Sequence, residues 1–469
     1  MIISNLKELD LSNIPIVIIG SGPSAITLAL ELEKKKIDCL IIEAGGEKYD
    51  YESQQSYKAE VVGNKVSNLT HSRLRQFGGT SGHWGGWCKP LEHYNFSNWN
   101  ISKKDLDKYS NEACEILGIK NQFRNVKLSS YFEQIEFQYS KARFAKKFRN
   151  RIEKSNYIKL ILETQVTHFE GDNGITRYAI CYSNGKRHKI ESKYFILACG
   201  GIENSRILLW TKEKNIGFID TNLPIGKYWM CHPWMLGGVG VIKKKEFKKI
   251  LKENYINYEG PIHIATTNKI REEKSILGGS LYMNAVEDTK IYKEVIKDLL
   301  CAAPELGKKI ARKVFKKDLK CGNIFLQLEE KPIIDNQVTL HTKLKDNLNI
   351  PITKLFYKQN KDTVRNAKIL LEQFADFCRK TGSGRIAILD EIYQLDSYDS
   401  LGVNHHIGGT RMGDDTKTSV VDKNLKLHNN RNLYVAGSSN FVSGGYANPT
   451  YTIVQMSLRL ASEISKKLI

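Results

Sequence analysis

The apolar and polar positions near the start of the chain follow the order of a βαβ unit. An apolar run at 14–19 leads into Gly20-Ser-Gly-Pro-Ser-Ala25. Apolar residues at helical spacing come next, and a second apolar run follows at 38–43. Two strands joined through a helix in this way lie parallel in one sheet. The pattern therefore predicts a Rossmann-like domain of the α/β class.

Further segments extend this domain and add a second one. We expect strands at 157–167 and 176–190 with an Asn-Gly turn at 184–185, and another buried strand at 194–201. Residues 221–399 combine mixed strands with a long helical segment at 360–381 and lack nucleotide-binding signals. The predicted organisation is a dinucleotide-binding domain at 1–220, a substrate domain with a mixed or antiparallel sheet and helices at 221–399, and a return to the first domain at 400–469.

The returning segment has its own predicted elements. It is rich in glycine from residue 402, with short strands expected at 418–427 and 432–437 and a final helix at 449–466. Asn448 is a suitable N-cap and Pro449 suits the first helical position. The apolar stripe of that helix contains Ile453, Met456, Leu460 and Ile464.

Composition supports two folded domains. The 469 residues exceed what one hydrophobic core usually holds, and 41% hydrophobic with 26% charged residues is ordinary for a folded chain. No apolar run approaches the roughly twenty residues of a transmembrane helix. Nine scattered cysteines without a C-x-x-C pair indicate neither a disulfide framework nor a zinc site. With no leader pattern at the first residues, we expect a cytoplasmic protein.

The net charge of +20 has several readings. An anionic substrate, a nucleic acid or a membrane surface would each attract a basic chain. Lysine outnumbers arginine about three to one and is spread along the whole sequence, which equally fits a lysine-biased proteome. The densest stretch, at 308–317, fits either a solvated helix of the substrate domain or one that makes peripheral contact with a membrane.

The first turn after the leading strand carries a nucleotide-binding fingerprint. Gly20 and Gly22 allow a tight turn and a close approach of a pyrophosphate to the helix that begins near Ala25. Glu43, at the end of the second strand, is placed to accept hydrogen bonds from ribose hydroxyls. Because an acid there disfavours a 2′-phosphate, the fingerprint predicts NAD or FAD.

Four separate segments resemble the glucose-methanol-choline (GMC) oxidoreductase family over nearly the full length of the chain. They are Arg75-Gln-Phe-Gly-Gly-Thr-Ser-Gly-His-Trp-Gly-Gly86, Tyr194-Phe-Ile-Leu-Ala-Cys-Gly-Gly-Ile-Glu-Asn204, His405-His-Ile-Gly-Gly-Thr-Arg-Met-Gly413 and Gly444-Gly-Tyr-Ala-Asn-Pro-Thr450. Their sequences most resemble those of pyranose oxidase-like members and bacterial sugar dehydrogenases. The resemblance implies an FAD cofactor and oxidation of an alcohol.

The fingerprint and the resemblance together give a set of expected cofactor-binding residues. They are Gly20, Gly22, Ser24, Ala25, Glu43, Arg75, Gly79, Thr80, His83, Trp84, Gly85, Val166, Ala198, Gly437, Asn448, Pro449 and Thr450. In pyranose oxidase-like proteins the histidine of a Ser/Thr-His-Trp triplet is linked covalently to the flavin. Here residue 82 is glycine, so His83 is either the covalent attachment point or a histidine that packs on the flavin without a bond.

The resemblance also implies the catalytic residues. Neighbouring residues of an extended chain point to opposite faces, so we expect only one of His405 and His406 to face the flavin. Because no third ligand lies nearby in the sequence, we do not expect the two histidines to bind a metal. The family's His-x-x-Gly spacing favours His405 as the base, with His406 behind it or as a second polar wall. Asn448 would hold the same substrate oxygen. A histidine titrates near neutral pH, which suits removal of a hydroxyl proton.

These residues predict an FAD-dependent oxidoreductase that converts a hydroxyl of a sugar or sugar-like polyol into a ketone or aldehyde. Many family members carry Asp-Ala-Ser where this chain has Ala436-Gly-Ser-Ser439. Sugar-acting members often have glycine there, so this difference favours a sugar substrate. Alternatives are a non-sugar alcohol such as a sterol or choline-like compound, an FAD protein that binds RNA, and a flavin-bound scaffold without activity. No RNA-recognition motif is present, so no nucleic-acid partner is expected. Oxygen, a quinone or a protein remain open as electron acceptor.

Overall fold

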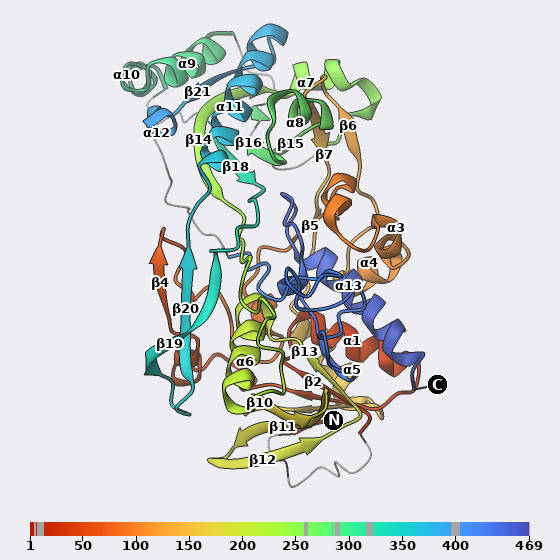
Figure 1. Ribbon diagram of the computed structural model, residues 1–469. Coiled ribbons are helices and arrows are strands. Elements are labelled where there is room, and N and C mark those ends of the chain that lie inside the picture. The colour runs from red at the N-terminus through yellow and green to blue at the C-terminus, as the bar shows by residue number, and fades with distance from the viewer. Residues whose placement is uncertain are drawn as a thin grey trace.

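The computed structural model describes residues 1–3, 6, 14–257, 261–283, 285–286, 291–315, 322–394 and 404–468. Two large sheets lie at opposite ends of an elongated molecule, and both termini lie beside the smaller of the two (Figure 1). The fold is a mixed helix and sheet architecture with a Rossmann-like sheet, which confirms the predicted class.

The first sheet has six strands, and every neighbouring pair is parallel. Their order is β1 (Ile2–Ile3), β9 (Ile158–Ile161), β3 (Cys39–Ile42), β2 (Ile16–Ile19), β13 (Tyr194–Leu197) and β22 (Leu433–Val435). Parallel sheets are covered on both faces, which explains why these strands are continuous apolar runs.

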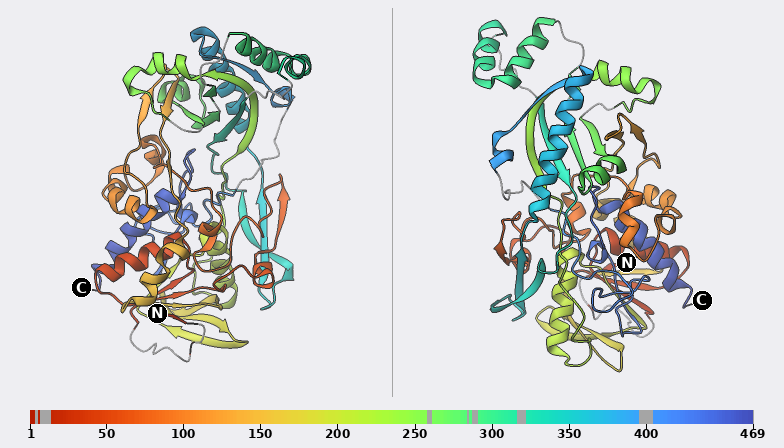
Figure 2. Two further views of the ribbon diagram at one scale, coloured as in Figure 1. Left: turned by 180° about the vertical axis from the view of Figure 1, so that it is seen from behind. Right: turned by 45° about the horizontal axis from the view of Figure 1, so that its top comes forward.

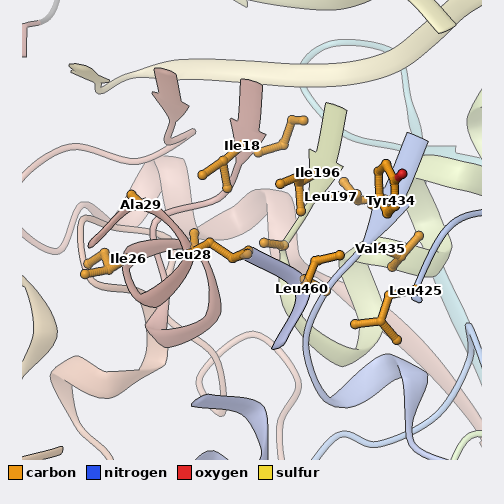
Figure 3. Packing of buried hydrophobic residues seen from close by; sticks show 14 of the residues in the cluster. Ile18, Ile26, Leu28, Ala29, Ile196, Leu197, Leu425, Tyr434, Val435 and Leu460 are labelled. Carbon is orange, nitrogen blue, oxygen red and sulfur yellow. The ribbon is translucent and has the colours of Figure 1, made fainter. Parts of the chain in front are cut away.

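Three helices cover one face of this sheet and a small sheet covers the other. The helices are α1 (Pro23–Lys34), α5 (Phe144–Lys154) and α13 (Thr450–Ser465). Figure 3 shows Leu28 of α1, Leu460 of α13 and Ile196 of β13 in one buried cluster. The opposite face carries an antiparallel meander of β10 (Thr164–Asp172), β11 (Ile175–Ser183) and β12 (Lys186–Glu191), whose last turn is the predicted Asn-Gly pair.

The second sheet is mostly antiparallel. Its order is β17 (Ala285–Val286), β14 (Trp234–Lys243), β18 (Gly322–Leu328), β16 (Gly279–Met283), β15 (Ile262–Thr266), β7 (Phe132–Ile135) and β6 (Asn125–Lys127), with β21 (Gly384–Ile388) also paired to β14. The long helix α11 (Lys361–Thr381) packs across it, and Phe374 contacts Phe132 edge-on with ring centroids 5.1 Å apart. Strands β6 and β7 join this sheet although they belong to the first 220 residues of the chain. The domain boundaries at 220 and 399 stay a prediction.

Smaller elements connect the two ends of the molecule. A three-stranded sheet of β19 (Gln337–Lys345), β20 (Pro351–Tyr357) and β4 (Ala59–Gly63) runs along one side (Figure 2). The helix α6 (Gly200–Lys214) follows β13 directly. The remaining elements are β5 (Trp87–Cys88), β8 (Gln138–Tyr139), α2 (Tyr51–Gln54), α3 (Lys103–Asp107), α4 (Ser110–Leu117), α7 (Lys244–Leu251), α8 (Asn268–Lys274) and α12 (Asp390–Gln394).

Two sequence expectations about secondary structure are corrected. The segment 418–427 forms isolated bridges of Val421 with Met412 and Leu427 and no strand, because it bends back on itself within a few residues. The segment 294–320, expected to form one peripheral helix of the substrate domain, contains parts of two helices, α9 (Ile291–Ala302) and α10 (Pro304–Phe315), which pack on each other. Pro304 lacks a backbone N–H and begins the second helix, as expected of proline at a first helical position. Lys316 and Lys317 lie outside the described residues.

The structure also shows the state of the cysteines and whether any helix could span a membrane. Seven cysteines in the described ranges are free thiols, and Cys301 is in a disulfide, which the sequence did not indicate. Within those ranges, no helix is both long and apolar enough to cross a membrane.

Candidate functional site

A cavity of about 400 Å³ lies where the central strands of the parallel sheet end. The residues that follow β2, β3 and β13 at their carboxyl ends, Gly20, Glu43 and Ala198, all line it. Ligands of open α/β sheets bind at this edge, because the loops there leave a crevice. The N-termini of α1, α6 and α13 also contribute to the wall, so three positive helix ends border the same space.

The two glycines of the fingerprint are needed for different structural reasons. A side chain at Gly20, whose φ is +98°, would meet the carbonyl oxygen of Ala198 at 2.6 Å. At Gly22 the position of a side chain is open, with no other atom within 4 Å. Gly20 is thus required for contact between two loops, and Gly22 keeps the space over the N-terminus of α1 clear.

Glu43 helps to hold the fingerprint loop in place. Its carboxylate accepts hydrogen bonds from the Ser21 backbone N–H at 3.0 Å, the Ser21 hydroxyl at 2.7 Å and the Gly45 N–H at 2.8 Å. Burial raises its pKa, and these hydrogen bonds and Arg75 oppose the rise. A carboxylate offers about four acceptor positions, so roughly one remains for a ligand hydroxyl.

The loop after Arg75 forms one wall of the cavity. Arg75 is buried and donates to the side chains of Ser53 and Gln165, while Trp84 donates from its indole N–H to the Ala142 carbonyl at 2.8 Å. His83 lies on the exposed part of this loop, and partial burial lowers its pKa. The loop is therefore fixed at two points, with His83 between them.

Sequence reasoning missed a buried group of charges on the cavity wall. Glu203 of α6 lies 2.7 Å from Arg73 and 3.3 Å from Arg206, and Arg206 lies 2.6 Å from Asp346. Each charge has an opposite partner, which a buried ion requires. Glu203 was within a quoted family segment, but nothing in the pattern indicated its distant partners.

The two candidate bases have separate partners. His405 Nδ1 lies 2.9 Å from His232 Nδ1, and His232 Nε2 lies 3.1 Å from the carbonyl oxygen of Gly444. Burial lowers the pKa of His405 to about 4. For His232, burial and then His405 lower the pKa to about 3. Both rings are consequently neutral at pH 7.

His406 lines the cavity as well, and which of the two histidines faces the flavin stays a prediction. Its Nε2 lies 3.0 Å from the Ser72 hydroxyl, and its ring packs near Trp229. Its Nδ1 is buried and has no hydrogen-bond partner among the described residues.

Asn448 does not cap the last helix as the sequence suggested. Helix α13 begins at Thr450, and no side chain caps its N-terminus. The Asn448 side-chain oxygen instead accepts from the Gln327 amide at 3.0 Å, and the same Gln327 nitrogen donates to the Tyr446 carbonyl. A partner from β18 has taken over the oxygen that capping would use.

All but one of the sequence-derived site residues line this cavity. Ala25 is fully buried in α1 and lies behind the wall. Besides the charges above, the wall contains residues that were not foreseen, Tyr57, Gln165, Cys199 and Asn404 among them. His232 and Gln327, which contact the candidate catalytic side chains, were not foreseen as site residues either, because these contacts join segments that lie far apart in the sequence.

Comparisons with known proteins agree with these motifs. The family model for GMC oxidoreductases matches residues 332–457. Among curated proteins, the chain is 26% identical over 318 residues to the fructose dehydrogenase large subunit of Gluconobacter japonicus, covering 66% of this chain and 54% of that protein. It is 23% identical over 310 residues to 2-methyl-1,2-propanediol dehydrogenase of Mycolicibacterium austroafricanum, covering 60% and 50%. The chain thus spans about half the length of the curated relatives it matches.

Solved structures share the fold. Pyridoxine 4-oxidase from Mesorbium loti superposes with a TM-score of 0.60 at 13% identity, covering 97% of this chain and 99% of that one. A variant of formate oxidase from Aspergillus oryzae gives a TM-score of 0.61 at 13% identity, covering 98% and 99%.

Proposed function

Because the chain belongs to the GMC oxidoreductase family, whose cofactor is FAD, we propose that it oxidises a hydroxyl of a sugar or sugar-like polyol to a ketone or aldehyde. One observation carries the proposal: His405 and Asn448 line the same cavity that the nucleotide fingerprint opens onto. A proton acceptor and a hydrogen-bonding amide beside a flavin site suit the oxidation of an alcohol.

The residues of the cavity fit FAD. Gly22 leaves the N-terminus of α1 open for the pyrophosphate, and Glu43 has roughly one acceptor position left for a ribose hydroxyl. The N-terminus of α13, which carries Thr450, would stabilise negative charge on the pyrimidine side of the flavin by about 1 kcal/mol. Bound FAD would supply the redox chemistry by accepting a hydride at N5.

We assign the proton transfer to His405. Burial keeps its imidazole neutral at pH 7, so it can accept the hydroxyl proton while the hydride leaves the same carbon. Asn448 would hold the substrate oxygen, and correct positioning of the carbon would lower the barrier further. His406, with Nε2 engaged by Ser72, would form a second polar wall.

The substrate class rests on the relatives and on Gly437. The names of the two curated relatives specify a sugar, fructose, and a diol, 2-methyl-1,2-propanediol. Gly437 lines the cavity, where sugar-acting members often carry glycine. The diol relative also favours a second candidate, a non-sugar alcohol. Oxygen, a quinone or a protein would take up the electrons.

Anaerobic mixing with a panel of alcohols tests the proposal without any assumption about the acceptor. We expect the yellow flavin absorbance to bleach with at least one sugar or polyol. Bleaching only by sterol, choline-like or other non-sugar alcohols would select the second candidate. If no alcohol bleaches a stoichiometric flavin, the proposed activity is wrong, and salt-dependent retention on RNA would then support an RNA-binding role.

A covalent link between His83 and the flavin is a separate proposal. His83 lines the cavity and lies on an exposed part of its loop, so its ring can reach a ligand. Acid precipitation of the purified protein separates the two readings, because only a covalent flavin stays with the pellet. His83→Ala should release the colour. Yellow supernatant from the parent protein would leave the histidine as a packing residue.

A further inference from the structure

Two residues that do not line the cavity contact the two residues assigned to the reaction. His232 precedes β14 and is 2% exposed, and Gln327 lies on β18. His232 contacts His405, and Gln327 contacts Asn448. Both come from the region of the second sheet, whereas His405 and Asn448 lie on loops that border the first.

The first contact can be resolved atom by atom. The Gly444 carbonyl oxygen only accepts hydrogen bonds, so the His232 Nε2 that faces it carries the hydrogen. A neutral imidazole has one hydrogen, which leaves His232 Nδ1 as an acceptor. The atom 2.9 Å away, His405 Nδ1, must then donate. In a neutral ring this leaves His405 Nε2 without a hydrogen.

We propose that His232 is a positioning residue that holds His405 in the tautomer whose Nε2 is free to accept the substrate proton. The hydrogen bond that one ring nitrogen of a histidine makes commonly decides which of the two nitrogens is protonated. No described residue makes a hydrogen bond to His405 Nε2, so this nitrogen remains available. The two hydrogen bonds that link Gly444, His232 and His405 thus decide which nitrogen of His405 accepts the proton.

The second contact works in the same way on the donor side. The Tyr446 carbonyl requires that the Gln327 atom facing it is the nitrogen. The same nitrogen faces Asn448, so the Asn448 atom it meets is the carbonyl oxygen. Asn448 Nδ2, with its two hydrogens, is then left to donate. Gln327 is the second positioning residue of the proposal.

Together the two contacts make the site complementary to a hydroxyl group. A hydroxyl donates one hydrogen and accepts through its oxygen. His405 Nε2 would take the hydrogen, and Asn448 Nδ2 would donate to the oxygen. This inference rests on the proposed function for its use of the substrate, but the tautomer and the amide orientation are properties of the resting protein.

The tautomer can be measured without substrate. In the FAD-loaded protein labelled with ¹⁵N-histidine, NMR correlation of ring nitrogens and carbon-bound hydrogens distinguishes the two tautomers, and loss of signals in His405→Ala assigns them. We expect a hydrogen on His405 Nδ1 and none on Nε2 at pH 7. In His232→Leu the two tautomers should become mixed. The opposite tautomer in the parent protein would overturn the proposal.

Two substitutions at His232 separate positioning from packing. Asparagine keeps an acceptor beside the backbone where His232 Nδ1 lies, whereas leucine has none, and both lose the bond to Gly444. We expect His232→Leu to slow anaerobic flavin reduction about tenfold to hundredfold without raising the apparent dissociation constant of the substrate. His232→Asn should recover most of the rate. Equal losses in both variants would show a purely structural role.

A matched control uses another buried histidine. His263 of β15 is 9% exposed and does not line the cavity. His263→Leu removes a buried imidazole in the same way, so a loss of stability is expected, with the His405 tautomer unchanged. A shift of that tautomer in His263→Leu equal to the shift in His232→Leu would contradict a specific effect.

Gln327→Glu tests the second half. The shape is kept, but a carboxylate cannot donate to Tyr446 or Asn448, so the amide should lose its orientation. We expect about tenfold slower flavin reduction with unchanged FAD content. Gln327→Leu should give a similar loss. An unchanged rate in both variants would remove Gln327 from the proposal. If no alcohol reduces the flavin at all, the proposed function fails while the NMR result on His405 still stands.

Discussion

The two large sheets contribute to the cavity in contrasting ways. The parallel sheet supplies the cofactor wall through short contiguous segments, such as the turn from Gly20 to Ala25, in which backbone shape decides the chemistry. The region of the antiparallel sheet contributes only indirectly, through two single side chains behind the wall: His232 contacts His405, and Gln327 contacts Asn448. Backbone sites leave a sequence pattern, whereas a lone contact across the molecule leaves none.

The largest expected effect lies on the parallel-sheet side. In Gly22→Val the new side chain would enter the open space over the N-terminus of α1 and block a pyrophosphate. Gly22 has a φ of −72°, so the backbone accepts the change without strain. We expect a folded protein without FAD, checked by absorbance and circular dichroism. Gly22→Ala, a smaller obstacle, should retain more. Stoichiometric FAD in the valine variant would refute the backbone reading of this wall.

The next effect tests the residue at which the two regions meet. His405→Ala should bind FAD normally and slow anaerobic flavin reduction by roughly a hundredfold to ten-thousandfold. Asn448→Ala should slow it less, and the two losses should not add because both groups contact one oxygen. His406→Ala is the comparison variant. A severe loss there with a mild one at His405 would exchange the roles of the two histidines.

A smaller effect is expected from pH. Folded His232 and His405 have pKa values of about 3 and about 4, below the unfolded value of about 6.5. Below pH 6.5 the unfolded chain therefore binds more protons, and stability should fall progressively toward pH 3. Denaturant titrations at several pH values check this. His405→Ala and His232→Leu should each flatten the pH dependence, and a slope identical to that of the parent protein would contradict the buried neutral pair.

The smallest effect concerns the far end of the second region. Lys308 and Lys309 lie on α10, which packs on α9 and does not line the cavity. Replacing them together with Lys316 and Lys317 by glutamine should therefore leave FAD content unchanged. If α10 meets an anionic membrane, each lysine contributes about 1 kcal/mol to binding, so the variant should bind anionic liposomes more weakly. No liposome binding by the parent protein would leave only the solvated-helix reading.

The same contrast explains how much could be foreseen. The parallel sheet, α1, α11 and α13 follow from apolar periodicity, and the cofactor wall from glycines whose positions are dictated by turns and close approach. The second sheet was expected only as a type, and strands β6 and β7 enter it from a segment without a distinct pattern. Asn448 shows the limit most clearly. Local reasoning made it a helix cap, but the amide of Gln327, 121 residues away, engages its oxygen.

The position of β22 has a consequence for how this protein forms during synthesis. β22 pairs with β13, yet residues 198–432 separate the two strands, and α13, which packs on α1, comes later still. While the ribosome adds the intervening residues, the nascent parallel sheet lacks an edge strand and part of its cover. Exposed apolar surface and an unpaired strand edge favour aggregation. Slow translation or early release of the chain should therefore increase its dependence on chaperones that shield the apolar face of α1.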